Sequence, residues 1–402
     1  MANAPGLWFR SLAESSLRRH DSHAALSWAE RASWISPRDP AAQLLAARAQ
    51  LQLNMNVAAR QLVKRSAALG APRRTLDAYE LMIAAQRGEL EAADELLGYV
   101  DNGPLPSETF EAIIRCAQQH GQLTRAALIL DQLEQTGTAL SVVAYQRGRN
   151  CEIAEDFSAA VLHYAKALQL EPHLTRAAFR TGMCYYRLRK FEQAEEMLRR
   201  ALRQPYTVVS SIELASCLWE QNKLEEAQAV ISLCLDEKPA KLHALYMQLD
   251  EFVDADRAAL VAGRIHDALG QSQQAVEMLQ LVLASNHRDF EALSLLIKNL
   301  RSLDRHRQAD ELTIVQTQMI AGRKRSRELL VELSDVLPGD PESIDKRCEL
   351  AALYWQTESA AEARLAIKEI LELDPNCERA TRLLAEIDRE QANQSRENST
   401  PR

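Results

Sequence analysis

Aromatic residues are scarce in this chain of 402 residues, at 5% of the total, although hydrophobic residues make up 47%. The cores of β-sheet proteins rely on aromatic and β-branched side chains, so this scarcity argues against a large β core. Much of the apolar content is alanine, which has the highest helix propensity and lets helices pack closely. The composition therefore predicts an all-α protein.

The sequence also lacks the short motifs that mark common catalytic and cofactor sites. It has no glycine-rich phosphate loop, no H-E-x-x-H, no G-x-S-x-G and no dinucleotide fingerprint. His20 and His23 could share a helix face, but no further ligand lies nearby in the sequence, so a solvated pair is the better interpretation. Carboxylate pairs such as Glu195-Glu196 complement the positive end of a helix dipole. We therefore expect no enzyme activity, no cofactor and no metal in this chain.

A basic excess and a long apolar run are absent too. The net charge of −8 disfavours nucleic acid as the main partner. No apolar run approaches the ~20 residues of a membrane span, and the N-terminus has no signal-peptide pattern. We expect a cytoplasmic protein that inserts no segment of its own into a membrane.

Cysteine is present seven times, an odd number, and no two cysteines form a C-x-x-C pair. Cys116, Cys184 and Cys217 fall at one position of the repeat described next, where a small hydrophobic side chain would face neighbouring helices. We interpret the cysteines as buried free thiols in a reducing compartment. A redox or metal role is the alternative.

What the sequence does contain is a repeated unit, seen best in residues 142–174. They form the pattern of two short amphipathic helices back to back, in which Gly148 and Ala160 each allow a close helix approach. Pro172 ends the second helix, because proline has no N–H and disfavours the helical conformation of the residue before it.

Equivalents of Ala160 recur along the chain, and the first seven of these alanines are 33 or 34 residues apart. A fixed period in this range predicts a helical solenoid. The ten alanines are Ala25, Ala59, Ala93, Ala126, Ala160, Ala194, Ala227, Ala275, Ala309 and Ala363.

This period, its small–aromatic–small spacing and its terminal proline resemble the tetratricopeptide repeat (TPR) family. The positions that carry the resemblance are Gly148, Ala160, Tyr164, Ala167 and Pro172. The resemblance implies an all-α, right-handed α-α superhelical solenoid of about ten helix-turn-helix repeats. The predicted repeats begin at Gly6, Pro40, Arg74, Ser107, Ser141, Thr175, Val208, Asp256, Phe290 and Ile344.

The repeat register also divides the chain. We expect repeats one to seven in 1–241, an inserted helix in 242–255, repeats eight and nine in 256–323, an insertion with a turn in 324–343, repeat ten and a capping helix in 344–390, and a disordered tail in 391–402. The first repeat begins almost at the first residue, with no capping helix before it. A membrane-anchored protein with an upstream segment is therefore the alternative to a cytoplasmic one.

The resemblance further implies where a partner would bind, because the first helices of TPR proteins line a concave groove. A basic ladder is predicted there, flanked by aromatic residues and further arginines. Guanidinium groups fork onto carboxylates and rigid aromatics make good anchors, which predicts a protein or peptide partner that is acidic with an apolar anchor. The predicted groove residues are Arg48, Arg115, Tyr145, Arg149, Phe179, Arg180, Tyr186, Arg187, Trp219 and Arg264. Glu111, Glu152 and Glu220 lie on the same predicted face, so internal pairing with the arginines is the alternative.

The leading functional hypothesis is a non-catalytic protein–protein interaction scaffold that holds a partner segment in this groove. A second hypothesis is a regulatory or substrate-binding TPR arm of an enzyme or assembly complex whose catalytic part is on another chain or upstream. A helical-repeat RNA reader is the third, and the acidic net charge disfavours it.

Overall fold

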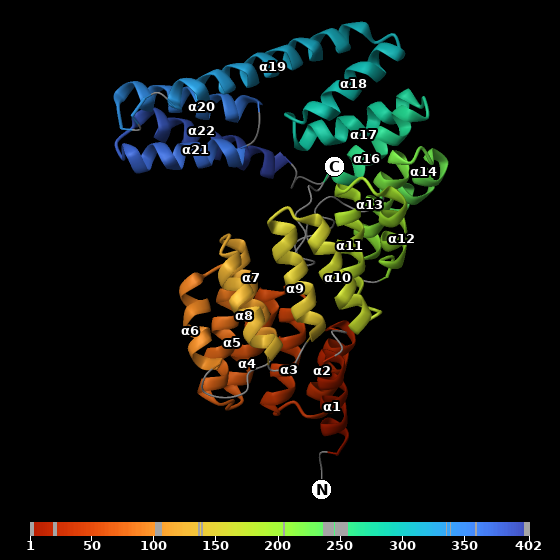
Figure 1. Ribbon diagram of the computed structural model, residues 1–402, viewed down its shortest axis with the longest axis vertical. Helices are drawn as coiled ribbons and strands as arrows, with labels where there is room; N and C mark the ends of the chain where they lie inside the picture. The colour runs from red at the N-terminus through yellow and green to blue at the C-terminus, as the bar shows by residue number, and fades with distance from the viewer. Residues whose placement is uncertain are drawn as a thin grey trace. The chain divides into compact units, whose positions relative to one another are not determined.

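The structure is a computed structural model, and it describes residues 4–18, 22–100, 107–135, 137, 140–203, 206–235, 245, 256–334, 336–337, 339–357 and 360–397. In this part of the chain all regular structure is helical, in 21 α-helices (Figure 1). The predicted all-α solenoid class is confirmed. The chain divides into two compact units, Met1–Ala255 and Asp256–Arg402, which are described separately.

The helices of the N-terminal unit pair as the first and second helix of successive repeats, and each pair packs against the next. The pairs are α1 (Ala4–Arg18) with α2 (Ser22–Ile35), α3 (Pro40–Gln52) with α4 (Asn56–Ala68), α5 (Arg73–Gln86) with α6 (Leu90–Val100), α7 (Ser107–Gln119) with α8 (Leu123–Gln135), α9 (Leu140–Ile153) with α10 (Phe157–Leu170), α11 (Thr175–Arg187) with α12 (Phe191–Arg200), and α13 (Thr207–Glu220) with α14 (Leu224–Ser232).

The C-terminal unit continues the same pattern and ends in a single helix. It contains α16 (Arg257–Ala268), α17 (Ser272–Ser285), α18 (Phe290–Ser302), α19 (His306–Ser334), α20 (Pro341–Thr357), α21 (Ala360–Leu373) and α22 (Glu378–Glu397). With 29 residues, α19 runs without a break into the second predicted insertion. It packs against both α18 and α20, so one helix serves two neighbouring repeats.

All ten marker alanines are buried, with exposed fractions of 0% or 1%. The close approach predicted at Gly148 is confirmed: a Cβ atom added there would lie 2.5 Å from Cε1 of Tyr164 on α10. Gly182 and Gly263 face Leu198 and Leu279 in the same way, in each case at 2.8 Å. The recurring small residues are therefore the contact points at which the two helices of a repeat touch.

A left-handed residue closes the turn between the two helices of each repeat from two to nine. Glycine takes this conformation at Gly88, Gly121 and Gly270. The other five turns use residues with a side chain, at φ between 55° and 60°. These are Asn54, Glu155, Arg189, Asn222 and Asp304. The turn is thus dictated by the packing of the two helices, since a side chain disfavours this conformation.

Two sequence expectations concern regions at the edge of what is described. The inserted helix predicted for 242–255 lies outside the described residues, apart from the helical Leu245. The tail predicted as disordered from Gln391 differs in its first part, because α22 continues to Glu397. Glutamine, glutamate, arginine and alanine are all good helix formers, so a helix that is already nucleated extends through them.

Six cysteines are buried and Cys151 is half-buried, and all seven are free thiols. Burial raises the pKa of the Cys184 thiol to about 12. The thiols at the shared repeat position therefore behave as small apolar side chains, as predicted.

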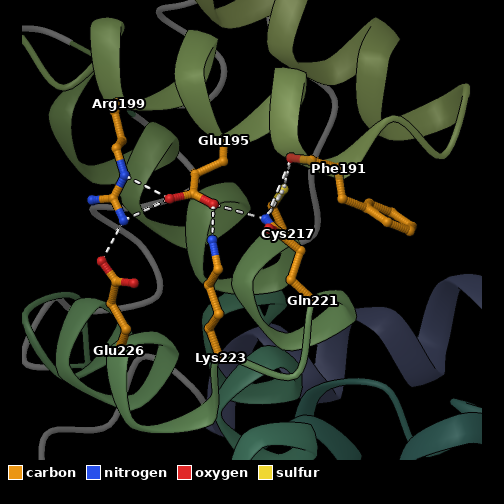
Figure 2. A network of polar contacts seen from close by, with 7 residues as sticks. All are labelled: Phe191, Glu195, Arg199, Cys217, Gln221, Lys223 and Glu226. Carbon is orange, nitrogen blue, oxygen red and sulfur yellow. Dashed lines mark hydrogen bonds and ion pairs between the residues drawn. The ribbon is translucent and has the colours of Figure 1, made fainter.

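A polar network joins α12 to the following repeat (Figure 2). The Glu195 carboxylate accepts hydrogen bonds from Lys223 Nζ at 2.7 Å, from Gln221 Nε2 at 2.9 Å and from Arg199 Nε at 2.9 Å. Arg199 also pairs with Glu226 on α14. Burial raises the pKa of Glu195, but the three hydrogen bonds outweigh it and lower this pKa to about 2.

This network predicts a pH-dependent contribution to stability. Because the pKa of Glu195 is lower in the folded protein, its contribution is complete above the unfolded value of 4.5 and is lost as the pH falls from there to about 2. Glu195→Gln is expected to destabilise the protein by at most about 1 kcal/mol at neutral pH. The difference from wild type should shrink below pH 4.5.

The measurement is thermal unfolding followed by circular dichroism, from neutral pH down to about pH 3. Glu196→Gln is the matched control, since its neighbouring carboxylate is exposed and outside the network. Equal melting temperatures of wild type and Glu195→Gln at neutral pH would show that the network adds nothing.

Candidate functional site

Charged side chains gather where the first helices of repeats two, four and six meet in the N-terminal unit. On α7, Glu108, Glu111 and Arg115 are spaced so that they share one helix face. Glu108 accepts from Arg48 Nη2 on α3 at 3.0 Å to each carboxylate oxygen, and from Gln52 Nε2 at 2.8 Å. Arg115 donates to the side chain of Asn54, which follows α3. Repeat four is thereby tied to repeat two.

A second contact ties repeat four to repeat six. Arg176 Nη1 on α11 lies 3.3 Å from Glu111 Oε2, and the same guanidinium stacks 4.3 Å above the ring of Tyr145 on α9. Two of its nitrogens, Nε and Nη2, are buried and make no hydrogen bond to the described residues. Burial disfavours the charge, but the carboxylate of Glu111 keeps the pKa of Arg176 above its usual value. Arg176 is therefore a cation with unused donors.

Glu152 is the centre of a third contact, at the end of α9. It accepts from Arg180 Nη1 at 2.8 Å and from the Tyr164 hydroxyl at 2.5 Å, and it lies 3.5 Å from Arg149 Nη1. Burial raises the pKa of Glu152, but the two arginines and the hydroxyl outweigh burial and lower it. Glu152 is therefore ionised at neutral pH.

We call these residues the arginine cluster. Tyr145, which contacts Arg176, and Tyr164, which contacts Glu152, connect the second contact to the third, since their ring centroids are 5.5 Å apart. Its members are the cations Arg48, Arg115, Arg149, Arg176 and Arg180 and the anions Glu108, Glu111 and Glu152. Five positive charges meet three negative ones, so the set is cationic at neutral pH.

Three of the predicted groove residues are core residues in the structure, which corrects the expectation that they face a partner. Tyr145, Phe179 and Arg180 have exposed fractions of 7%, 1% and 7%. Phe179 points toward the next repeat, where its ring lies 5.4 Å from that of Tyr206. Phe179 thus fills the interface with the next repeat instead of facing outward.

The other predicted residues are distributed over different environments. Arg264 lies in the C-terminal unit, where it pairs with Glu291. Tyr186 is half-buried with its hydroxyl 3.4 Å from Glu220, and Trp219 is half-buried as well. Arg187 is exposed. The internal pairing left open by the sequence is present at Arg48, Arg149, Arg180 and Arg264.

Sequence reasoning did not single out Arg176, Gln52 or Glu108. The spacing of Glu108, Glu111 and Arg115 on one helix face was visible in the sequence. Their partners were not, since they lie 56 to 65 residues away in the sequence. The basic run at residues 323–327 is also used internally: Arg325 pairs with Glu332 and Glu349, and Arg323 donates to the carbonyl of Thr357.

The residues that the structure describes contain neither a candidate metal site nor a candidate membrane span. No three histidine, cysteine, aspartate or glutamate side chains come together there in a way that could hold a metal ion. Among the same residues, no helix has the length and apolar character needed to cross a membrane.

Comparison with known families gives a match within the N-terminal unit. The family model described as tetratricopeptide repeat matches residues 153–206, which run from the end of α9 to the start of α13. Residues 153–206 are therefore tetratricopeptide repeat sequence. TPR proteins are in general non-catalytic scaffolds for protein interaction, and the fold suggests that broad role here.

Solved structures similar to this chain share little of its sequence. A human IFIT1 dimer with PPP-AAAA matches at 14% identity over 75% of this chain and 69% of that chain, with a TM-score of 0.44. The APC/C hetero-tetramer Cut9-Hcn1 matches at 12% identity over 96% of both chains, with a TM-score of 0.39. A MamA RS-1 double mutant matches at 14% identity over 45% of this chain and 94% of that chain, also at 0.39. No curated protein matches this chain.

Proposed function

We propose that this chain is a non-catalytic scaffold whose N-terminal unit binds an acidic segment of a partner protein along one face of α11. Arg176, Arg180, Met183 and Arg187 lie three or four residues apart and share that face. The face passes from the arginine cluster at Arg176 to the exposed end of the helix at Arg187. It therefore offers guanidinium groups from the interior to the surface.

The observation that carries the proposal is the exposed guanidinium group of Arg187. It is exposed, and among the described residues it makes no hydrogen bond or ion pair. An exposed arginine can take a carboxylate with both arms of its planar fork. Arg176 lies further along the same face and adds positive charge there, although its two unused nitrogens are buried.

The arginine cluster limits what such a partner can do. Arg48, Arg149 and Arg180 already hold carboxylates of the chain itself. A partner gains little by displacing these internal carboxylates, because one ion pair would only replace another. We therefore place first contact at Arg187, with half-buried Trp219 on α13 as a candidate apolar anchor.

The test uses a fluorescently labelled peptide of about 12 residues that is rich in glutamate and contains one tryptophan, and its glutamine analogue. We expect only the acidic peptide to bind, and Arg187→Glu to weaken that binding about tenfold at low salt, chiefly by slowing association. Fluorescence anisotropy and stopped-flow mixing at two salt concentrations measure both quantities.

Arg65→Glu is the matched control, because Arg65 is also exposed but lies on the second helix α4. Equal loss of binding in the two arginine variants would indicate a non-specific charge effect. Equal binding of the acidic peptide and its glutamine analogue would contradict the proposal directly.

Single-stranded RNA is the competitor that the same chemistry allows, since guanidinium groups also fork onto phosphates. The net charge of −8 disfavours it. An RNA oligomer that binds more tightly than the acidic peptide, and loses its binding in Arg187→Glu, would replace the scaffold proposal by RNA binding.

A further inference from the structure

Two cysteine side chains touch inside the C-terminal unit. Cys348 lies on α20, and Cys377 lies immediately before α22. Their Sγ atoms are 3.6 Å apart, and both residues are free thiols. The exposed fraction is 2% for Cys348 and 9% for Cys377. The pair belongs to the apolar core shared by α20, α21 and α22.

The separation of the two sulfurs is close to what a disulfide requires. A disulfide has an S–S length of about 2.05 Å, so the two sulfurs need to approach each other by about 1.5 Å. A rotation of one cysteine side chain between staggered positions moves its sulfur by more than that. Side-chain rotation can therefore supply the approach of the two sulfurs.

We propose that Cys348 and Cys377 form a modification site, a dithiol that reacts with a small-molecule disulfide such as oxidised glutathione and closes into an intramolecular disulfide. Closure fastens α22 to α20. Neither the interaction role of the repeats nor the α11 face is needed for this site.

Cys377 is the attacking thiol. It is the more exposed of the two, and it precedes the first turn of α22, where its own carbonyl accepts from the backbone N–H of Thr381. Cys348 is more deeply buried, and its burial together with its hydrogen bond to Cys377 raises the pKa of its thiol to about 12. It therefore suits the second step.

The reaction proceeds by two thiol–disulfide exchanges. Cys377 loses its proton and attacks one sulfur of the small disulfide, which forms a mixed disulfide and releases one thiolate that takes up a proton. Cys348 then loses its proton and attacks Sγ of Cys377, which forms the internal bond and expels the second thiol. Two thiols of the protein are oxidised, and one disulfide is reduced to two thiols.

The bond would act at the end of the repeat array. It closes a loop that contains α21, Ala360–Leu373, between the two helices it joins. A terminal helix contacts a neighbour on one side only, so it opens more readily than an internal one. Closing a loop of this size is expected to slow the opening of α22 on the order of a hundredfold.

The experiment uses the full chain, reduced and freed of reductant, and then treated with oxidised glutathione. We expect the thiol count after denaturation to fall from seven to five. Tryptic digestion should give a cross-linked pair of peptides, residues 348–364 and 369–379, each with one cysteine. Hydrogen exchange of α22 amides should slow in the oxidised protein.

Two variants make the result decisive. Cys116→Ser removes another buried thiol and should leave the cross-link intact. Cys377→Ser has six thiols, and no disulfide to residue 348 should form in it, whether or not other thiols become oxidised. A glutathione adduct on Cys377 without the internal bond would overturn the proposal, as would a cross-link between other cysteines. Unchanged hydrogen exchange in α22 after closure would overturn the fastening role.

Discussion

Replacing Gly148 by alanine is expected to destabilise the N-terminal unit by about 3 kcal/mol. The added Cβ would lie 2.5 Å, 2.6 Å and 2.9 Å from three ring carbons of Tyr164. Tyr164 is fully buried, and its hydroxyl is held by Glu152. The ring therefore cannot swing aside, and α9 and α10 have to separate instead.

Urea unfolding followed by circular dichroism measures this effect, and Gly98→Ala provides the control. Gly98 is also a helical glycine, on α6, but a Cβ added there meets nothing within 4 Å. Alanine at such a site is expected to stabilise the protein by up to about 1 kcal/mol, because it restricts the unfolded chain. A destabilisation of Gly98→Ala as large as that of Gly148→Ala would mean that the contact with Tyr164 is not the cause.

Replacing Glu152 by alanine is the second large effect, with an expected destabilisation of about 3 kcal/mol. The substitution removes the carboxylate that Arg149 and Arg180 share, and these two side chains have exposures of only 15% and 9%. Tyr164→Phe removes only the hydroxyl from the same site, and we expect it to cost about 1 kcal/mol. Urea unfolding measures the free energy of unfolding of both variants. A larger loss in Glu152→Ala than in Tyr164→Phe would show that the charge contributes more than one hydrogen bond, and equal losses would contradict this.

The same carboxylate gives the loss a pH dependence. The pKa of Glu152 is lowered from 4.5 by its arginines, so its contribution is complete above that pH and disappears as the pH falls below it. Glu152→Gln should therefore match wild type more closely in acid than at neutral pH. A constant difference between the two proteins across this range would contradict the assignment.

The repeat register could be read from the sequence because it depends on single residues. A methyl group is what fits where two helices touch, so Ala160 and its equivalents mark each second helix without reference to the rest of the fold. Gly148 marks the first helix for the same reason. The turns were less visible, since Glu155 and Arg189 adopt a left-handed conformation that their residue types do not indicate.

The candidate site could be predicted only in part. The sequence shows that Arg48 and Glu108 are each on a first helix, but their contact depends on the angle through which one repeat turns from the next. That angle is set by packing at every intervening interface, and small changes in it exchange one partner for another. The assignment of Phe179 to a partner-facing surface was wrong for a similar reason. A small rotation of α11 about its axis decides whether this side chain faces the next repeat or the solvent.

The long helix α19 gives the C-terminal unit a mechanical property that the other helices lack. Its 29 residues correspond to a rod of about 44 Å, and its two halves pack against α18 and α20. Under a pulling force, repeats held only by short helices can detach one at a time. Repeats nine and ten share this rod, so they should give way together, as a single larger step in a force–extension trace.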